Sequence, residues 1–305
     1  MITDAASQVP PPGKINLDHL AHFVPDMESA SVALTQLGFT LTPFSPQSHR
    51  LEPGGPLVSA GTGNRCIMLK HGYLEFLTPT ADTPMANQLR VAIERYVGVH
   101  LIAFGTSSPE MDRERLATAG FKPLAPVALQ REIATPSGRD TARFTVVRVP
   151  PGTMAEGRIQ YCQHHTPQLV WQDRWLQHAN GAQALRAVLL CVEDPRHTAQ
   201  RYARFTSLQP EQDRDLWRLD TARGTLLFMG SEQCRRLFGL TPPALPWIAG
   251  YALASDDIAA STDRLRGAQC DSALLDNERL LVRLPPAAGG IILFISSANT
   301  RLAFD

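Results

Sequence analysis

The sequence predicts an α+β protein built from four βαβββ modules, which pair into two domains of one architecture. Two observations predict this fold. A short strand pattern occurs four times, and the same strand and helix precede each copy. In addition, 44% of the 305 residues are hydrophobic and 19% are charged, which is typical of a globular protein with a real core.

The repeated pattern is glycine, any residue, leucine or isoleucine, any residue, and an aromatic residue. Its alternation is typical of a short strand. The copies are Gly72–Phe76, Gly157–Tyr161, Gly224–Phe228 and Gly290–Phe294. A single copy would be ordinary, but four copies at similar places in four segments indicate a repeat.

Each segment opens with an apolar strand and continues with an amphipathic helix. The opening strands are expected at Leu17–Val24, Val99–Phe104, Arg186–Val192 and Trp247–Leu253, and the helices at residues 26–37, 109–119, 195–205 and 256–267. Aspartate or serine at the start supplies an N-cap, and glycine after the helix, as at Gly38 and Gly120, supplies a left-handed C-cap.

One such module exposes a sheet face, so two must pair and close a curved sheet around a cavity. We therefore expect an N-terminal domain over residues 15–180 and a C-terminal domain over residues 185–305, with the boundary near residues 177–184. A helix within residues 78–96 is inserted between the first two modules. Residues 1–14 are polar and proline-rich and are expected to form a flexible leader.

Charge and motifs exclude several classes of protein. The 29 basic residues balance the 29 acidic ones, and there is no basic stripe of the kind that binds nucleic acid. No apolar stretch approaches the length that crosses a membrane, and no secretory signal is present. The five cysteines are odd in number and lack CxxC spacing, which favours a reducing cytoplasm. No phosphate loop or dinucleotide fingerprint occurs, so no nucleotide cofactor is expected.

At this point the sequence resembles the vicinal oxygen chelate superfamily, and within it the glyoxalase-like domain proteins. The resemblance rests on Leu17–Leu20 with Val24–Asp26, Leu37–Phe39, Gly61–Cys66, Tyr73–Phe76, and His164–Pro167 with Trp171. The close match covers about residues 15–177, and the second half looks like a divergent copy. The superfamily includes isomerases, extradiol dioxygenases, thiol transferases that open epoxides, and metal-free drug-binding proteins, so the fold alone does not give the reaction.

The resemblance implies metal ligands at one position on the first strand and one on the last strand of each module. In the first two modules these positions hold His19, Glu75, His100 and Gln160, which could bind a divalent ion such as Zn, Ni, Mn or Fe. In the last two modules they hold residues without ligand atoms, namely Ala187, Leu227, Ala249 and Leu293. Any metal and substrate are therefore expected in the N-terminal half.

Gln160 takes the place where the family's isomerases carry a catalytic base. Glutamine has no titratable group, so Glu75 would have to serve as the base, and we expect Glu75 and His100 to be the catalytic residues. The alternative is that His19 and His100 are ordinary strand histidines, hydrogen-bonded to their neighbours.

Substrate contacts are expected from Asn64, Arg65 and His164. Alternation places Asn64 on one face of its strand with Cys66, and Arg65 on the other. His22 should point away from His19.

The function expected is that of a metal-dependent lyase, isomerase or dioxygenase acting on a small oxygen-rich substrate. The alternative is a metal-free protein of the same fold that binds or sequesters a small molecule. A small molecule is the expected partner in both cases. The C-terminal half would serve as a structural element, a lid or a homodimer interface.

Overall fold

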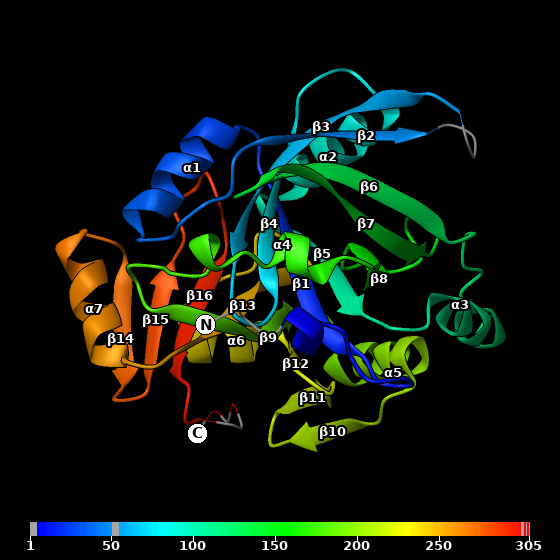
Figure 1. Cartoon of the computed structure of the whole chain (residues 1–305). Coiled ribbons are helices and arrows are strands. Elements are labelled where there is room, and N and C mark those ends of the chain that lie inside the picture. Colours follow the sequence, from blue (N-terminus) through cyan, green and yellow to red (C-terminus); the bar gives the residue numbers. More distant parts are fainter. Residues whose placement is uncertain (1–4, 51–54, 300–301, 303, 305) are drawn as a thin grey trace.

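The computed structural model describes residues 5–50, 55–299, 302 and 304. Within them the chain forms four successive βαβββ modules, shown in Figure 1. All four copies of the repeated pattern contribute strands, which confirms the predicted fold class. The described residues contain no helix long and apolar enough to cross a membrane.

The elements are as follows. The first module holds β1 (Asn16–Phe23), α1 (Met27–Gln36), β2 (Ser45–Arg50), β3 (Leu57–Met68) and β4 (Tyr73–Pro79). The second holds β5 (Gly98–Gly105), α3 (Pro109–Thr118), β6 (Val127–Thr135), β7 (Gly138–Arg148) and β8 (Arg158–His164). The third holds β9 (Ala182–Cys191), α5 (Pro195–Thr206), β10 (Pro210–Asp213), β11 (Leu216–Asp220) and β12 (Thr225–Met229). The fourth holds β13 (Trp247–Ser255), α7 (Ile258–Gly267), β14 (Ser272–Asp276), β15 (Arg279–Arg283) and β16 (Ile291–Ser296). Outside the modules lie η1 (Ala5–Gln8), α2 (Pro84–Arg95), α4 (Pro167–Val170), η2 (Asp173–Trp175) and α6 (Ser231–Phe238).

The module helices begin where the capping residues predict. The side chains of Asp26, Asp194 and Asp257 accept hydrogen bonds from backbone N–H groups in the first turns of α1, α5 and α7. Such caps satisfy donors that the helix cannot satisfy itself. Ser108 precedes α3 but its side chain makes no cap bond.

The sheet topology brings the first and last strands of every module together. β1 pairs with β4, β5 with β8, β9 with β12, and β13 with β16, each time in parallel. The opening strands pair in antiparallel fashion within each half, β1 with β5 and β9 with β13. One sheet runs through both halves, because Ile248 of β13 pairs with Val99 of β5.

A close contact between backbones explains why each repeat has glycine at this position. Gly72, Gly157 and Gly290 have positive φ and lie against the backbone of the first strand of their own module. A Cβ added at Gly72 or Gly290 would lie 2.8 Å from a carbonyl oxygen of that strand, and one at Gly157 would collide with the carbonyl oxygen of His100. The glycine therefore lets the parallel pair begin.

The interiors of the two halves are filled differently. In the C-terminal half, one apolar cluster joins Ala187, Leu227, Ala249 and Leu293 to α6 and to Leu302 and Phe304. In the N-terminal half, two small clusters occupy the ends of the interior. One packs Leu89 of α2 against Phe23 and Leu101, and the other packs Trp171 against Tyr73. Polar side chains occupy the space between these clusters.

The segment before β1 touches the first module. Gln8 is buried, its amide donates to the carbonyl of Lys70 (2.7 Å), and its amide oxygen accepts from the N–H of Gly72 (3.4 Å). The first strand of the third module, β9, begins at Ala182, within the segment expected to divide the two domains. The division itself stays a prediction.

Candidate functional site

Glu75 lies on the interior face of β4 and is held by two amides. The Asn64 side chain donates to Glu75 Oε1, and Gln47 Nε2 donates to the same oxygen at 3.3 Å. Thr62 in turn donates to Gln47 Oε1 (2.8 Å). The register of β3 on β4 causes this arrangement, because Cys66 pairs with Glu75. Glu75 Oε2 makes no hydrogen bond to the described protein, so one carboxylate oxygen stays available.

A pair of arginines faces the interior from the second module. Arg148 of β7 pairs with Gln160 of β8, and its Nε donates to Gln160 Oε1 at 3.2 Å. Its two terminal nitrogens make no hydrogen bond to the described residues. Arg158 lies two residues before Gln160, over the Phe23 ring at 5.8 Å. Burial, and after it the nearby Arg148 charge, lowers the pKa of Arg158 to about 10.

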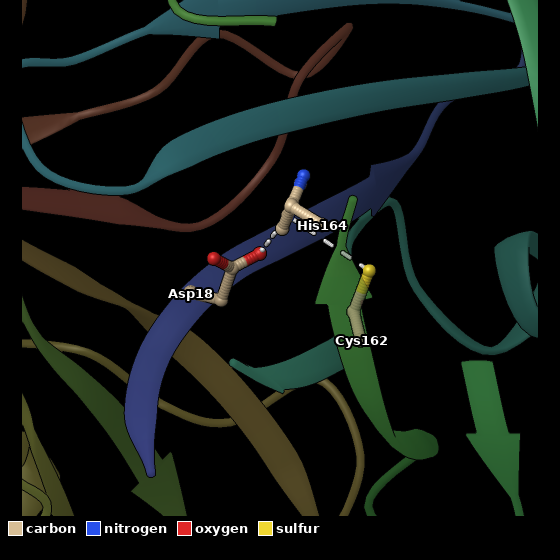
Figure 2. Close-up of side chains that lie close together, drawn as sticks. All are labelled: Asp18, Cys162 and His164. Atoms are coloured by element: carbon tan, nitrogen blue, oxygen red, sulfur yellow. Dashed lines mark hydrogen bonds and ion pairs between the residues drawn. The ribbon is translucent and has the colours of Figure 1, made fainter. Parts of the chain in front are cut away.

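A second polar group lies farther along the interior, across the strand β5 (Figure 2). Asp18 Oδ2 accepts from His19 Nδ1 at 2.6 Å and from His164 Nε2 at 3.0 Å. Cys162 Sγ lies 3.8 Å from the same nitrogen of His164. Gly105 of β5 pairs with Cys162, so no side chain stands between the strands here. The ligand atoms of Asp18, Cys162 and His164 all lie within 4.8 Å of one another, so this group could hold a metal ion.

Burial and charge couple the members of this group. Although burial alone would raise it, the charges of His164 and His19 hold the pKa of Asp18 well below its usual range. Burial alone would lower the pKa of His164, but the Asp18 carboxylate raises it to about 10. Asp18 Oδ1 and His164 Nδ1 are buried without a hydrogen-bond partner among the described residues. The group therefore has unused ligand atoms.

His100 packs between Phe23, at one end of this interior, and Tyr96. Its ring stacks on Tyr96 and Phe23, with centroids 4.0 and 5.3 Å away, and its Nε2 donates to the Tyr96 carbonyl at 2.7 Å. Burial lowers its pKa to about 4. His19 stacks on Tyr73 at 4.4 Å.

His19, Glu75 and His100 do not bring their ligand atoms within 4.8 Å of one another in the described part of the chain, and Gln160 accepts a hydrogen bond from Arg148. Among the described histidines, cysteines, aspartates and glutamates, only Asp18, Cys162 and His164 form a group of three within ligand range. The assignment of His19, Glu75, His100 and Gln160 as metal ligands therefore stays a prediction that no contact here supports.

The residues predicted to contact substrate do not all face the interior. Asn64 faces the interior with Cys66, whereas Arg65 lies on the opposite face with Ile67. His164 faces the interior and is surrounded by aromatic rings, with Trp171 4.8 Å away. His22 points away from His19, as expected, and contacts Tyr251.

Sequence reasoning did not single out Asp18, Arg148 or Arg158. Asp18 sits at a β-bulge between Leu17 and His19, which changes the register on β5 and cannot be read from alternation. Arg148 lies in the site because it pairs with Gln160 across two neighbouring strands, β7 and β8. The sequence does show an arginine on the strand that precedes the one carrying the predicted ligand Gln160, and this could have pointed to Arg148.

A cavity of about 580 Å³ opens elsewhere, between β9 and the turn that joins β11 to β12. Each of its arginines makes at least one hydrogen bond in the protein, although Arg218 Nη1 and Arg223 Nε and Nη2 are buried without a hydrogen-bond partner among the described residues. Arg218 forms two hydrogen bonds with Asp220 (3.0 and 2.8 Å), Arg223 donates to the Ser7 carbonyl (2.9 Å), and Arg186 donates to the Asn299 carbonyl (3.3 Å). The N-terminal interior is favoured as the functional site because Glu75, Asn64 and Gln160, which the sequence predicted for a site, lie there with Arg148.

Solved structures resemble this chain over nearly its whole length. A hypothetical protein from Staphylococcus aureus aligns with a TM-score of 0.64 at 10% identity, over 92% of this chain and 99% of that one. A triple mutant of 4-hydroxymandelate synthase from Streptomyces coelicolor aligns with a TM-score of 0.58 at 16% identity, over 95% and 94%. These likenesses show the vicinal oxygen chelate fold.

A fusion of a xylose isomerase-like TIM barrel with 4-hydroxyphenylpyruvate dioxygenase aligns with a TM-score of 0.59 at 12% identity, over 94% of this chain. This chain spans half the length of that fusion protein. No curated protein sequence matches. The family model for the glyoxalase-like domain matches residues 17–206, which is more than half of the chain. The protein therefore belongs to the glyoxalase-like domain family.

Proposed function

We propose that the interior of the N-terminal half binds a small oxygen-rich acid and that Glu75 removes a proton from it, as in an isomerase or lyase. The observation that carries this proposal is that the two terminal nitrogens of Arg148, which lies beside Arg158, make no hydrogen bond to the described residues. Glu75 is the carboxylate whose charge acts on both arginines. The charge of Glu75 also acts on the partly buried Arg131. One carboxylate does not balance three guanidinium groups, so this end of the interior has an excess of positive charge.

An anion would relieve this imbalance. Two like charges in a partly buried site raise the free energy of the folded protein, and a bound carboxylate lowers it again. Guanidinium groups bind carboxylates through paired, charge-assisted hydrogen bonds. A small acid that binds Arg148 would place its remaining oxygens near Glu75, Asn64 and Gln160.

The contacts of Glu75 suit a general base. Its Oε1 is fixed by Asn64 and Gln47, while its Oε2 is free to accept a proton. The arginines would stabilise negative charge that develops on the substrate oxygens. Asn64 positions the base, and Gln160 positions Arg148.

The fold family implies a divalent metal that polarises the substrate oxygens. His19, Glu75 and His100 do not lie within 4.8 Å of one another in the described residues, so each step above uses side chains alone. The same observation favours one alternative function, a metal-free protein that binds the acid without changing it.

The test is a thermal-shift screen with 2-oxo acids, 2-hydroxy acids and catechol carboxylates, each beside its neutral amide. We expect at least one acid to raise the melting temperature, and Arg148→Met to abolish that rise. Arg143→Met is the matched control, because Arg143 is exposed on the same strand. Equal shifts in wild type and Arg148→Met, or none with any acid, would contradict the proposal.

A test for turnover distinguishes the two candidate functions, an enzyme and a protein that only binds the acid. Exchange of the substrate C–H hydrogen with deuterated solvent, followed by proton NMR, should occur in wild type and be lost in Glu75→Gln, which should still bind. Binding without exchange in wild type would establish the alternative function.

A further inference from the structure

We infer that Asp18, Cys162 and His164 form a metal site for a thiophilic divalent ion of the zinc type, separate from the family's ligand positions. The inference does not depend on the proposed substrate. It rests on the identity, spacing and burial of three side chains that two different strands bring together.

The spacing suits a tetrahedral ion. Zinc bonds of about 2.0 Å to nitrogen or oxygen and about 2.3 Å to sulfur put neighbouring ligand atoms about 3.3–3.6 Å apart. Here Asp18 Oδ2 lies 3.0 Å from His164 Nε2, and Cys162 Sγ lies 3.8 Å from that nitrogen. All three ligand atoms lie within 4.8 Å of one another, and an ion seated among them would replace the Nε2 proton of His164.

The register of three neighbouring strands creates this group. Cys162 and His164 alternate onto one face of β8, and the bulge at Asp18 turns its carboxylate toward them from β1. The strand between carries Gly105, whose added Cβ would already contact Asp18 at 3.4 Å. A larger side chain at this position would crowd the carboxylate.

The surroundings also suit a metal site. Asp18 is fully buried, and its second oxygen, Oδ1, has no partner among the described residues. A buried polar atom without a partner costs about 1–3 kcal/mol, so an ion bound by both carboxylate oxygens would also satisfy Oδ1. His19 donates to Asp18 at 2.6 Å and fixes the orientation of the carboxylate, as outer hydrogen bonds do around metal ligands.

The donor set selects the class of ion. A thiolate with an imidazole favours zinc or cobalt over magnesium or calcium, which prefer oxygen ligands. Three protein ligands leave a fourth position that a water molecule could complete.

Cobalt titration tests this assignment, because a Co²⁺–thiolate bond gives a charge-transfer band that oxygen and nitrogen ligands do not give. Metal-free full-length protein should bind one Co²⁺ per chain with this band, and added Zn²⁺ should remove it. Cys162→Ser should lose the band. Cys66→Ser should keep it, since Cys66 is buried in the same half but outside the group.

A second pair of variants separates this site from the family's positions. Asp18→Asn should weaken Co²⁺ binding at least tenfold, and Glu75→Gln should leave it unchanged. No uptake of Co²⁺, or a band kept in Cys162→Ser, would overturn the assignment. Loss of binding in Glu75→Gln alone would place the ion at the family's positions instead. The acid screen with Arg148→Met is unaffected by either result, so the two proposals fail separately.

Discussion

The hydroxyl group of Tyr251, in the fourth module, donates to Nε2 of His22, in the first, at 3.2 Å. The other ring nitrogen of His22 donates to the Ala288 carbonyl at 2.9 Å. This arrangement requires a neutral ring with its hydrogen on Nδ1. One buried imidazole thus links the two halves of the chain, and its protonation would break the link.

Acid should therefore destabilise the protein through His22. Burial lowers the pKa of His22 to about 4, from an unfolded value of about 6.5. Between these values the unfolded chain binds more protons than the folded one, so stability falls as pH falls, by up to about 1.4 kcal/mol per pH unit. Urea unfolding at several pH values should show a shallower pH slope for His22→Gln than for wild type. The exposed His165→Gln is the control, and equal slopes in all three proteins would contradict this reading.

The repeated glycine should tolerate no side chain. Gly157→Ala should lower the free energy of unfolding by about 2 kcal/mol or more, because the new methyl group meets the His100 carbonyl. Gly152→Ala is the matched control. Gly152 also has positive φ but no atom within 4 Å, so its cost should be limited to backbone strain of about 1 kcal/mol. Equal losses in denaturant unfolding would show that the contact is unimportant.

Arg148 should lower the free energy of unfolding, although it binds the proposed ligand. Replacing it by methionine keeps much of the volume and removes one of two repelling charges, so Arg148→Met should unfold at a higher denaturant concentration, with a gain of about 1 kcal/mol. Loss of binding together with increased stability is typical of a functional residue. A variant that binds poorly and is also less stable would instead indicate a structural role.

The C-terminal interior should behave as an ordinary core. Leu293→Ala should lower the free energy of unfolding by about 2–5 kcal/mol, because Leu293 is fully buried in an apolar cluster. The same change should leave acid binding in the N-terminal half intact at temperatures where the variant is folded. A ligand affinity that changes tenfold would mean that the C-terminal half takes part in the site.

The modules were predictable because their signals are local. The helix caps at Asp26 and Asp257 and the glycine before each last strand act within a few residues, so the sequence displays them directly. The alternation of β3 likewise placed Asn64 and Arg65 on opposite faces.

The site was less predictable because its contacts cross strands. Asp18 meets His164 only through a bulge and a shared neighbour strand, and Arg148 meets Gln160 only through the register of a hairpin. His100 turns toward Tyr96, which a repeat-equivalent position could not reveal. Equivalent positions in a repeat thus predict strands better than they predict where side chains point.

The central claim is that the ligand site lies in the N-terminal interior. The most direct test is a calorimetric titration of the strongest-binding acid from the screen into wild type, Arg148→Met and Arg186→Met, where Arg186 lines the separate cavity of about 580 Å³. Arg148→Met should weaken binding at least tenfold, and Arg186→Met should bind as wild type does. The reverse result, with binding lost in Arg186→Met and kept in Arg148→Met, would contradict the claim.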